Sequence, residues 1–158
     1  MKMDIIAGKI GGNHEQRREG KMIRLTIPGP PCGKQRARTF RHRQSGKIVS
    51  MTPVKTVNYE ALVKQTFVAK YPDFIPVSGP IRMLMSIFVM PSKEAARKIK
   101  NRLETYPTIK PDISNIQKAI EDALNGLAYV DDKQIVRIDA RKGYSDRPRV
   151  EIVVEEVT

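Results

Sequence analysis

Alternation between apolar and polar positions predicts four strands along the chain. Residues 23–27 are apolar at every second position, which is typical of a half-buried strand. Residues 81–89 alternate in the same way and their other face is partly apolar too, so we predict a central strand there. Residues 135–140 and 150–157 also alternate, and the turn-forming stretch 143–148 separates them. We therefore predict that the last two strands form a hairpin.

Apolar positions at helical spacing predict three helices. The first has Thr52 as its N-cap residue and Pro53 at its first position, and it ends near residue 70. Its predicted buried stripe consists of Val54, Val57, Ala61, Leu62 and Val68. The second, over residues 92–104, is rich in Lys and Arg and is either a basic arm or a solvated helix. The third extends from Asp112 to Leu127, and its predicted buried stripe consists of Ile113, Ile116, Ile120, Ala123, Leu124 and Leu127.

The order of these elements is β-α-β-(α)-α-β-β, with no internal repeat. It predicts one α+β domain over residues 22–158, with a mixed β-sheet and packed helices. Residues 1–21 are glycine-rich and show little periodicity, so we expect a flexible N-terminal tail without a signal peptide. The segment from Arg17 to Met22 is what a purine-rich ribosome-binding sequence would encode, which suggests Met22 as the natural start.

The charge of the chain bears on its function. The chain of 158 residues has 29 Lys and Arg against 17 Asp and Glu, a net charge of +12. Such an excess favours a polyanionic partner, most commonly nucleic acid. A solubilising surface, a ribosome-associated protein and a protein that binds an anionic membrane surface are the alternatives. Aromatic residues are only 6% of the chain and Trp is absent, which argues against platforms that stack single-stranded bases.

The composition also limits the chemistry. No apolar run approaches the roughly 20 residues of a membrane span, so no membrane partner is expected. The single cysteine, Cys32, fits a reducing cytoplasm. His14 and His42 are the only histidines, which disfavours a zinc site or a Ser-His-Asp triad. Any metal would be held mainly by oxygen atoms, which indicates Mg²⁺ or Mn²⁺. No small-molecule cofactor is expected.

A basic segment follows the first strand. Residues 33–50 contain six Lys or Arg and no acidic residue, punctuated by glycine. Such a loop suits contacts with phosphate groups. The candidate DNA-binding residues are Lys34, Arg36, Arg38, Arg41 and Arg43. The alternative is a solvated, mobile loop.

Acidic residues flank the last predicted helix. Asp112 stands at its start, where backbone N–H groups can steady a carboxylate, and Asp131 and Asp132 follow its end. If the loop folds back along the helix, these carboxylates can hold Mg²⁺, which polarises a phosphate and lowers the pKa of bound water. Lys118, which shares a helix face with Asp122 and Asn115, can offset charge in the transition state. The alternative is that Asp112 caps a helix, the other two acids form a turn, and Lys118 is solvated.

Several separated motifs occur together in one order. The first group is Ile27 to Pro31, Lys34 to Arg38, and Thr52 to Glu60. The second group is Lys110 to Asn115, Lys118, Asp122 to Gly126, Asp131 with Asp132, and Gln134 to Val136. Over residues 22 to 157 this combination resembles the RusA family of phage and prophage Holliday-junction resolvases.

The resemblance implies a homodimeric, Mg²⁺-dependent endonuclease that cuts four-way DNA junctions with paired symmetric nicks, in a bacterial or phage-encoded cytoplasmic setting. Two identical sites would match the two-fold symmetry of the junction. By position, Asp112 and Asp132 would bind the metal and Lys118 would be the essential basic residue. Asp131 would support Asp132, and Asn115 would support the start of the helix.

Ser114 departs from the family pattern, which is Asp-x-Asp-Asn. A neutral hydroxyl stands where the resemblance implies a second carboxylate of the catalytic group. Three explanations remain open: a natural chain with weakened or lost activity, an engineered inactive form, or a site in which Ser114 acts through a bridging water while Asp131 or Asp122 takes part of the load. The alternative functions are an inactive protein that binds branched DNA and an RNA- or ribosome-associated basic protein.

Overall fold

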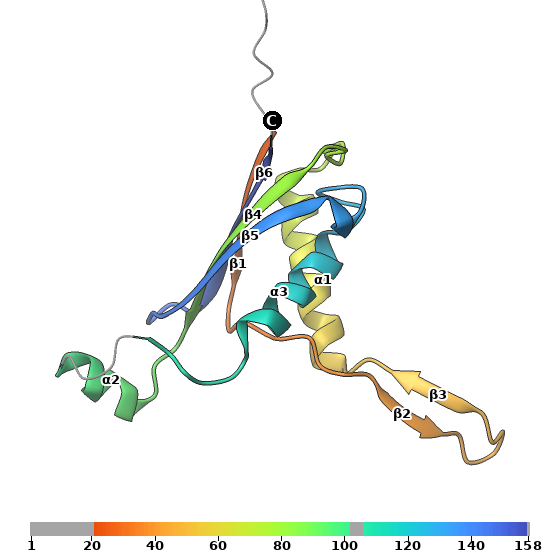
Figure 1. The fold of residues 1–158 in the computed structure, drawn as a ribbon. Helices are drawn as coiled ribbons and strands as arrows, with labels where there is room; N and C mark the ends of the chain where they lie inside the picture. Colours follow the sequence, from red (N-terminus) through yellow and green to blue (C-terminus); the bar gives the residue numbers. More distant parts are fainter. Residues whose placement is uncertain (1–20, 102–105, 158) are drawn as a thin grey trace, which may run out of the picture.

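The computed structural model describes residues 21–101 and 106–157. One mixed sheet carries two helices on one face, and a separate two-stranded hairpin projects from the body (Figure 1). The strands are β1 (Met22–Pro28), β2 (Arg38–Arg41), β3 (Ile48–Met51), β4 (Ile81–Val89), β5 (Ile135–Tyr144) and β6 (Arg149–Glu156). The helices are α1 (Val54–Lys70), α2 (Lys93–Lys100), α3 (Ile113–Leu124) and the 3₁₀ turn η1 (Asp132–Gln134). The predicted single α+β domain with a mixed sheet is confirmed.

The strand order in the large sheet is β1-β6-β4-β5. Strand β4 pairs with β6 antiparallel and with β5 parallel, so its predicted central position is confirmed. The predicted hairpin between the last two strands is wrong, because β4 lies between them. The connection from β5 to β6 steps across the end of β4, where Ser145 N–H donates to the carbonyl of Val89 at 3.0 Å. The most apolar strand thus takes the most buried place, and β5 is reached from it by a helical crossover.

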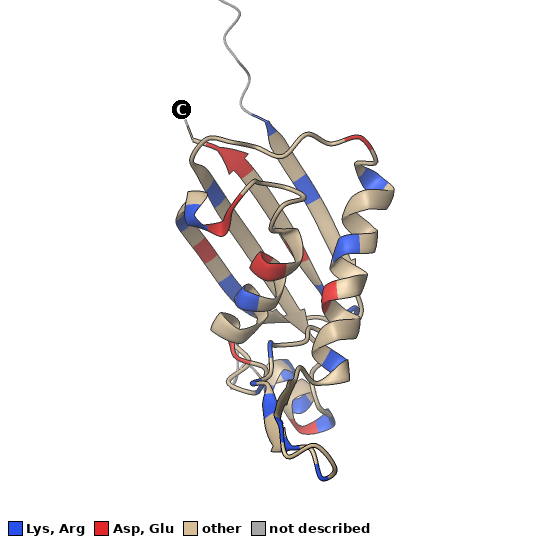
Figure 2. Ribbon diagram, turned by 90° about the vertical axis from the view of Figure 1, so that its right-hand side faces the viewer, with Lys and Arg blue, Asp and Glu red and all other residues tan. Residues whose placement is uncertain are grey.

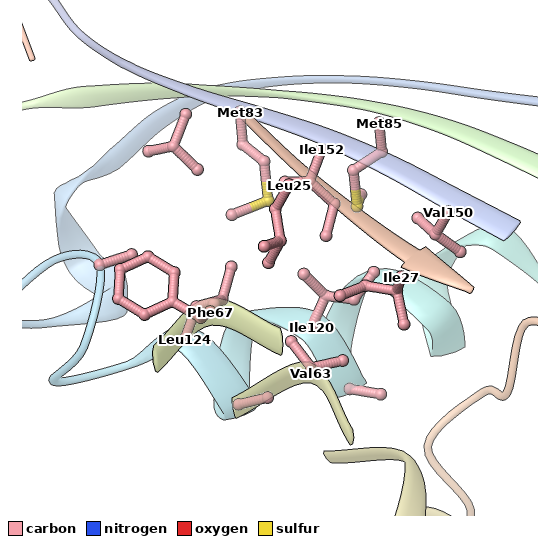
Figure 3. Packing of buried hydrophobic residues seen from close by; sticks show 14 of the residues in the cluster. Leu25, Ile27, Val63, Phe67, Met83, Met85, Ile120, Leu124, Val150 and Ile152 are labelled. Carbon is pink, nitrogen blue, oxygen red and sulfur yellow. The ribbon is translucent and has the colours of Figure 1, made fainter. Parts of the chain in front are cut away.

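The core lies between the sheet and the helices α1 and α3 (Figure 3). The alternate residues of β1, β4 and β6 that point to this side are buried, as the alternation predicts. The helix face of α1 is not the predicted one: its buried residues are Thr56, Tyr59, Val63 and Phe67. Val54, Val57 and Val68 are exposed instead, Val54 to 66%. Large aromatic side chains at helical spacing bury more apolar area than the valines do, and they decide which face packs.

The predicted helix ends are corrected in three places. Helix α1 begins at Val54 with Pro53 as its N-cap residue and no side-chain cap, so Thr52 is not the cap. Helix α3 ends at Leu124 rather than Leu127, and its predicted buried stripe is otherwise largely confirmed. In α2 the hydroxyl of Ser92 accepts from Ala95 N–H, and the helix ends at Lys100 with Asn101 as its C-cap residue, before the predicted end at residue 104, which lies outside the described residues.

The predicted tail, residues 1–21, and the absence of a signal peptide concern residues that, except for Lys21, also lie outside the described part. Met22 is the first residue of β1. None of the helices in the described part is long and apolar enough to cross a membrane.

Phe67 and its neighbour Val68 test the packing face of α1. The Phe67 side chain is 2% exposed and its ring lies 5.4 Å from that of Tyr71, whereas Val68 is 47% exposed. We expect Phe67→Ala to lower the free energy of unfolding by about 3–5 kcal/mol. Val68→Ala should change it by less than about 0.5 kcal/mol, because it removes little buried area. Urea unfolding of both variants measures this difference, and equal losses would contradict the assigned helix face.

Candidate active site

Residues 33 and 34 lie against the first turn of α3. Lys34 N–H donates to the carbonyl of Asn115 at 2.8 Å. A Cβ atom at Gly33 would stand 2.9 Å from the Cβ of Asn115 and 3.3 Å from that of Pro111, so only glycine allows this approach. A groove forms here, lined by Gly33, Lys34, Arg36, Lys55, Lys110 and Asp112 among others. The first residues of the basic segment, Gly33 and Lys34, and the first turn of α3 therefore form one site.

Asp112 occupies the predicted place at the start of α3, as its N-cap residue. Its side chain is exposed and does not cap the helix; its Oδ2 accepts a long bond of 3.4 Å from Asn115 Nδ2. Lys142 of β5 holds the chain just before it, donating to the carbonyls of Ile109 at 2.5 Å and Pro111 at 3.1 Å. The carboxylate is thus free to bind a ligand while the backbone beneath it is tied down.

Lys118 and Lys34 share one carboxylate, that of Asp122. Lys118 Nζ lies 3.0 Å from Asp122 Oδ1 and 3.3 Å from Asp132 Oδ2. Lys34 Nζ pairs with Asp122 Oδ2 and lies 3.2 Å from Glu60 Oε1. The pairs join α1, α3, the turn at residues 131–134 and the segment after β1. The turn after α3 thus lies beside the middle of that helix, because Asp132 reaches Lys118.

The shared carboxylate shifts the acid-base properties of its neighbours. Hydrogen bonding to Asp122 raises the pKa of Lys118, and the contact with Asp132 adds to this. The pKa of Lys34 is raised by Asp122 in the same way. Partial burial opposes ionisation of Asp122, but the two lysines outweigh it and its pKa is lowered. All three groups are therefore charged at neutral pH.

The turn that carries Asp132 is fixed by its neighbours. Asp131 is the N-cap residue of η1, and its carboxylate accepts from Lys133 N–H at 3.0 Å, which lowers the pKa of Asp131. Gln134 accepts from Asp131 N–H and donates to the carbonyls of Val77 and Gly79. Asp131 is thus engaged in building the turn, which leaves Asp132 to face Lys118.

The carboxylates do not form a closed metal cage. Within residues 21–101 and 106–157, no three His, Cys, Asp or Glu side chains are close enough together to hold an ion. Ser114 lines a shallow groove with Asp112, Gln117 and Arg141 and places no carboxylate there. Exposed carboxylates are nevertheless the donors that Mg²⁺ prefers, and Mg²⁺ keeps several waters and takes substrate phosphates as its other ligands. The structure therefore offers separate carboxylates, Asp112 at the start of α3 and the half-buried Asp132 beside Lys118, and among the described residues no site made of protein ligands alone.

The predicted DNA-binding residues fall into two groups. Arg38 and Arg41 are exposed on β2, and Arg43 is exposed in the turn that follows. Arg36 lines the groove beside Asp112. Lys34 differs from them, because its Nζ is engaged by Asp122 and Glu60. The segment is a β-hairpin over much of its length and not the irregular loop that its glycines suggested.

The sequence analysis did not predict the roles of four residues. Glu60 pairs with Lys34, and Asp122 bridges the two lysines. Gln134 ties the turn to residues 77 and 79, and Lys142 holds the chain before Asp112. Lys142 could have been found from the sequence. It falls on the same side of β5 as Ile138 and Ala140, where a charged residue is unusual and indicates a specific partner. The pairing of Lys34 with Asp122 could not have been found in this way, because the two residues are far apart in the chain.

The fold and the site together define a basic α+β protein with acids and lysines paired beside one helix. Comparison with known families matches residues 28–155 to the family described as Endodeoxyribonuclease RusA. The chain therefore belongs to the RusA family of endodeoxyribonucleases, and this confirms the resemblance carried by its motifs. Family membership implies an endodeoxyribonuclease that acts on crossover junctions in DNA.

Two relatives illustrate the match. The uncharacterized protein YqaN of Bacillus subtilis (strain 168) is 34% identical over 141 residues, covering 86% of this chain and 97% of that protein. The crossover junction endodeoxyribonuclease rusA of Lactococcus phage r1t is 31% identical over 103 residues, covering 65% of this chain and 73% of that protein.

Asp122→Asn tests the bridge between the two lysines. Because the folded pKa of Asp122 is lowered, its contribution is present above the ordinary carboxyl pKa of about 3.9 and is lost as the pH falls through the folded value. We expect the variant to be about 1 kcal/mol less stable near neutral pH, since the group is only partly buried. The difference from wild type should shrink below about pH 4.

Urea unfolding across that pH range measures this effect, with Asp73→Asn in the exposed turn after α1 as the control. A difference that does not change with pH would mean that the charge of Asp122 contributes nothing.

Proposed function

We propose that this protein is a Mg²⁺-dependent endonuclease that resolves four-way DNA junctions by paired symmetric nicks, and that it acts as a homodimer. The observation that carries the proposal is the position of Lys118. Lys118 lies on α3, the helix that has Asp112 as its N-cap residue, and its Nζ contacts Asp132 of the following turn. An acid, a fixed cation and a second acid are the groups needed around a scissile phosphate.

Asp112 and Asp132 would hold the metal. When bound, Mg²⁺ (or Mn²⁺ in its place) supplies polarisation of the phosphate and a bound water of lowered pKa. Lys118 stays protonated because its pKa is raised, and its charge can offset the negative charge of the transition state. Asp131 supports Asp132 through the turn, and Asn115 supports the start of α3.

The basic hairpin would contact the DNA backbone. Arg36, Arg38, Arg41 and Arg43 make no ion pair with an acidic residue of the described part, so they are available for phosphates. A dimer would bring two such sites to the two-fold axis of the junction. A bacterial or phage-encoded cytoplasmic enzyme fits this substrate.

Ser114 favours a second candidate, a protein that binds branched DNA without cutting it. With a hydroxyl in place of an acid, the site loses one negative charge. The same surroundings would then hold a phosphate more readily than a metal.

A gel assay with a labelled four-way junction beside a linear duplex tests the proposal. We expect symmetric nicks in the junction with Mg²⁺ or Mn²⁺, none with chelator, and much weaker action on the duplex. Binding of the junction without nicks in any metal would favour the second candidate. An absence of any preference for the junction would refute both.

Ser114→Asp should raise the rate of cleavage in Mg²⁺ by about tenfold or more, because it adds a charged oxygen ligand beside Asp112. The control is Gln65→Glu, which makes the same change of charge at an exposed position of α1. Single-turnover nicking at saturating protein separates this effect from binding. If both variants cut like wild type while still binding the junction, Ser114 does not limit activity.

A further inference from the structure

The β2–β3 hairpin has two chemically different faces. Directly paired residues of an antiparallel ladder point to the same side, and so do residues two apart along a strand. The pairs Phe40–Val49 and Arg38–Met51 therefore share one face. The other face carries Thr39, Arg41, Ile48 and Ser50. The first is an apolar face with a single arginine, and the second is mainly polar.

The apolar face is not covered by any other element of the described residues. Phe40 is 45% exposed and Met51 is 52% exposed. The hairpin extends away from the sheet and from α1, with no other element of the described chain packed on it (Figure 1). An isolated two-stranded hairpin is only marginally stable, and apolar side chains on it gain from a partner that removes them from water.

Charge indicates what that partner is. Residues 33–50 contain six basic residues and no acidic one. Lys and Arg positions recur along the projecting hairpin, where the ribbon is blue (Figure 2). Only Lys34 among them is neutralised by carboxylates of the described residues. Two copies of this segment would repel each other, which disfavours an exchange of hairpins in a dimer. A polyanion that also offers flat apolar surfaces satisfies both the charge and the exposed face, and nucleic acid is that partner.

We propose that Phe40, supported by Val49 and Met51, is a wedge that packs against bases at the branch point of a DNA junction. This inference rests on the proposed function and adds the element that distinguishes branched from linear DNA. In a continuous duplex each base is stacked on both sides, so insertion must first separate a base step. At a branch point the stack is already interrupted, and an aromatic ring can cover the exposed base at a lower cost.

The segment just before β2, at Lys34, connects the wedge to the site. Lys34 N–H bonds to Asn115, and Lys34 Nζ pairs with Asp122 on α3. A hairpin anchored at these two points places its bound strand in a fixed relation to Asp112. The wedge therefore selects the branched substrate and also sets which phosphate lies at the site.

The test uses a four-way junction that carries 2-aminopurine next to the branch point, with chelator present so that nothing is cut. Binding of wild-type protein should raise the emission of the probe about twofold or more, because the base leaves its neighbour in the stack. Phe40→Ala should abolish most of this rise and weaken junction binding by at least about fivefold, while duplex binding changes by less than about twofold.

Two control variants come from the opposite face of the same hairpin. Ile48 is 75% exposed, so Ile48→Ala removes a similarly exposed apolar side chain and should leave the emission unchanged. Arg41→Ala should weaken junction and duplex binding alike and flatten the salt dependence by about one unit, with the emission retained.

Three other results would each overturn the wedge. A wild-type emission change that survives in Phe40→Ala, on a junction that the protein still prefers, overturns the wedge and leaves the proposed function intact. A wild-type protein that does not prefer the junction overturns both. Dissociation of a free dimer in Phe40→Ala, seen by sedimentation without DNA, would show that a second copy covers this face and that the wedge is wrong.

Discussion

The carboxylate of Asp122 is the interaction on which the arrangement of the site depends. It binds one lysine from its own helix and one from the segment after β1, and the first of these lysines also binds Asp132. Three parts of the chain that are distant in sequence are thereby joined at one point. The contact is partly buried, so its electrostatic strength exceeds that of an ordinary surface pair, and it is less screened by salt.

This arrangement has a consequence for metal affinity. Each carboxylate that faces Lys118 is already partly neutralised, so the free energy that a divalent ion gains there is smaller than at an isolated acid. A site of this kind gains much of its affinity from phosphate oxygens that arrive with the substrate. Ser114 strengthens that dependence, since it removes one further charge near Asp112. In the proposed function, the metal and the DNA would then bind together, each increasing the affinity of the other.

Much of the scaffold could be predicted because its signals are local. The alternation of residues 81–89 specified a buried strand, and the spacing of Lys118 and Asp122 placed the two side chains together on one helix face. Strand neighbours could not be predicted in the same way, because alternation shows which face is buried and says nothing about which strand lies alongside. The face of α1 was missed because the valines were weighted above Tyr59 and Phe67. The pairing of Lys34 with Asp122 had no local signal at all.

The hairpin shows why a charge pattern alone was an incomplete guide. Its basic residues were visible in the sequence and predicted a segment that could meet a polyanion. The pairing of its two strands was not visible. Both faces of the hairpin are in water and neither is uniformly apolar, so the sequence shows no alternation of apolar and polar residues that would predict strands. Only the register, with Phe40 opposite Val49, separates an apolar side from a polar one. Charge explains attraction to any DNA, since phosphates are the same everywhere along it. Discrimination requires a feature that phosphates lack, and on this hairpin the apolar face is the feature that can sense an interrupted stack of bases.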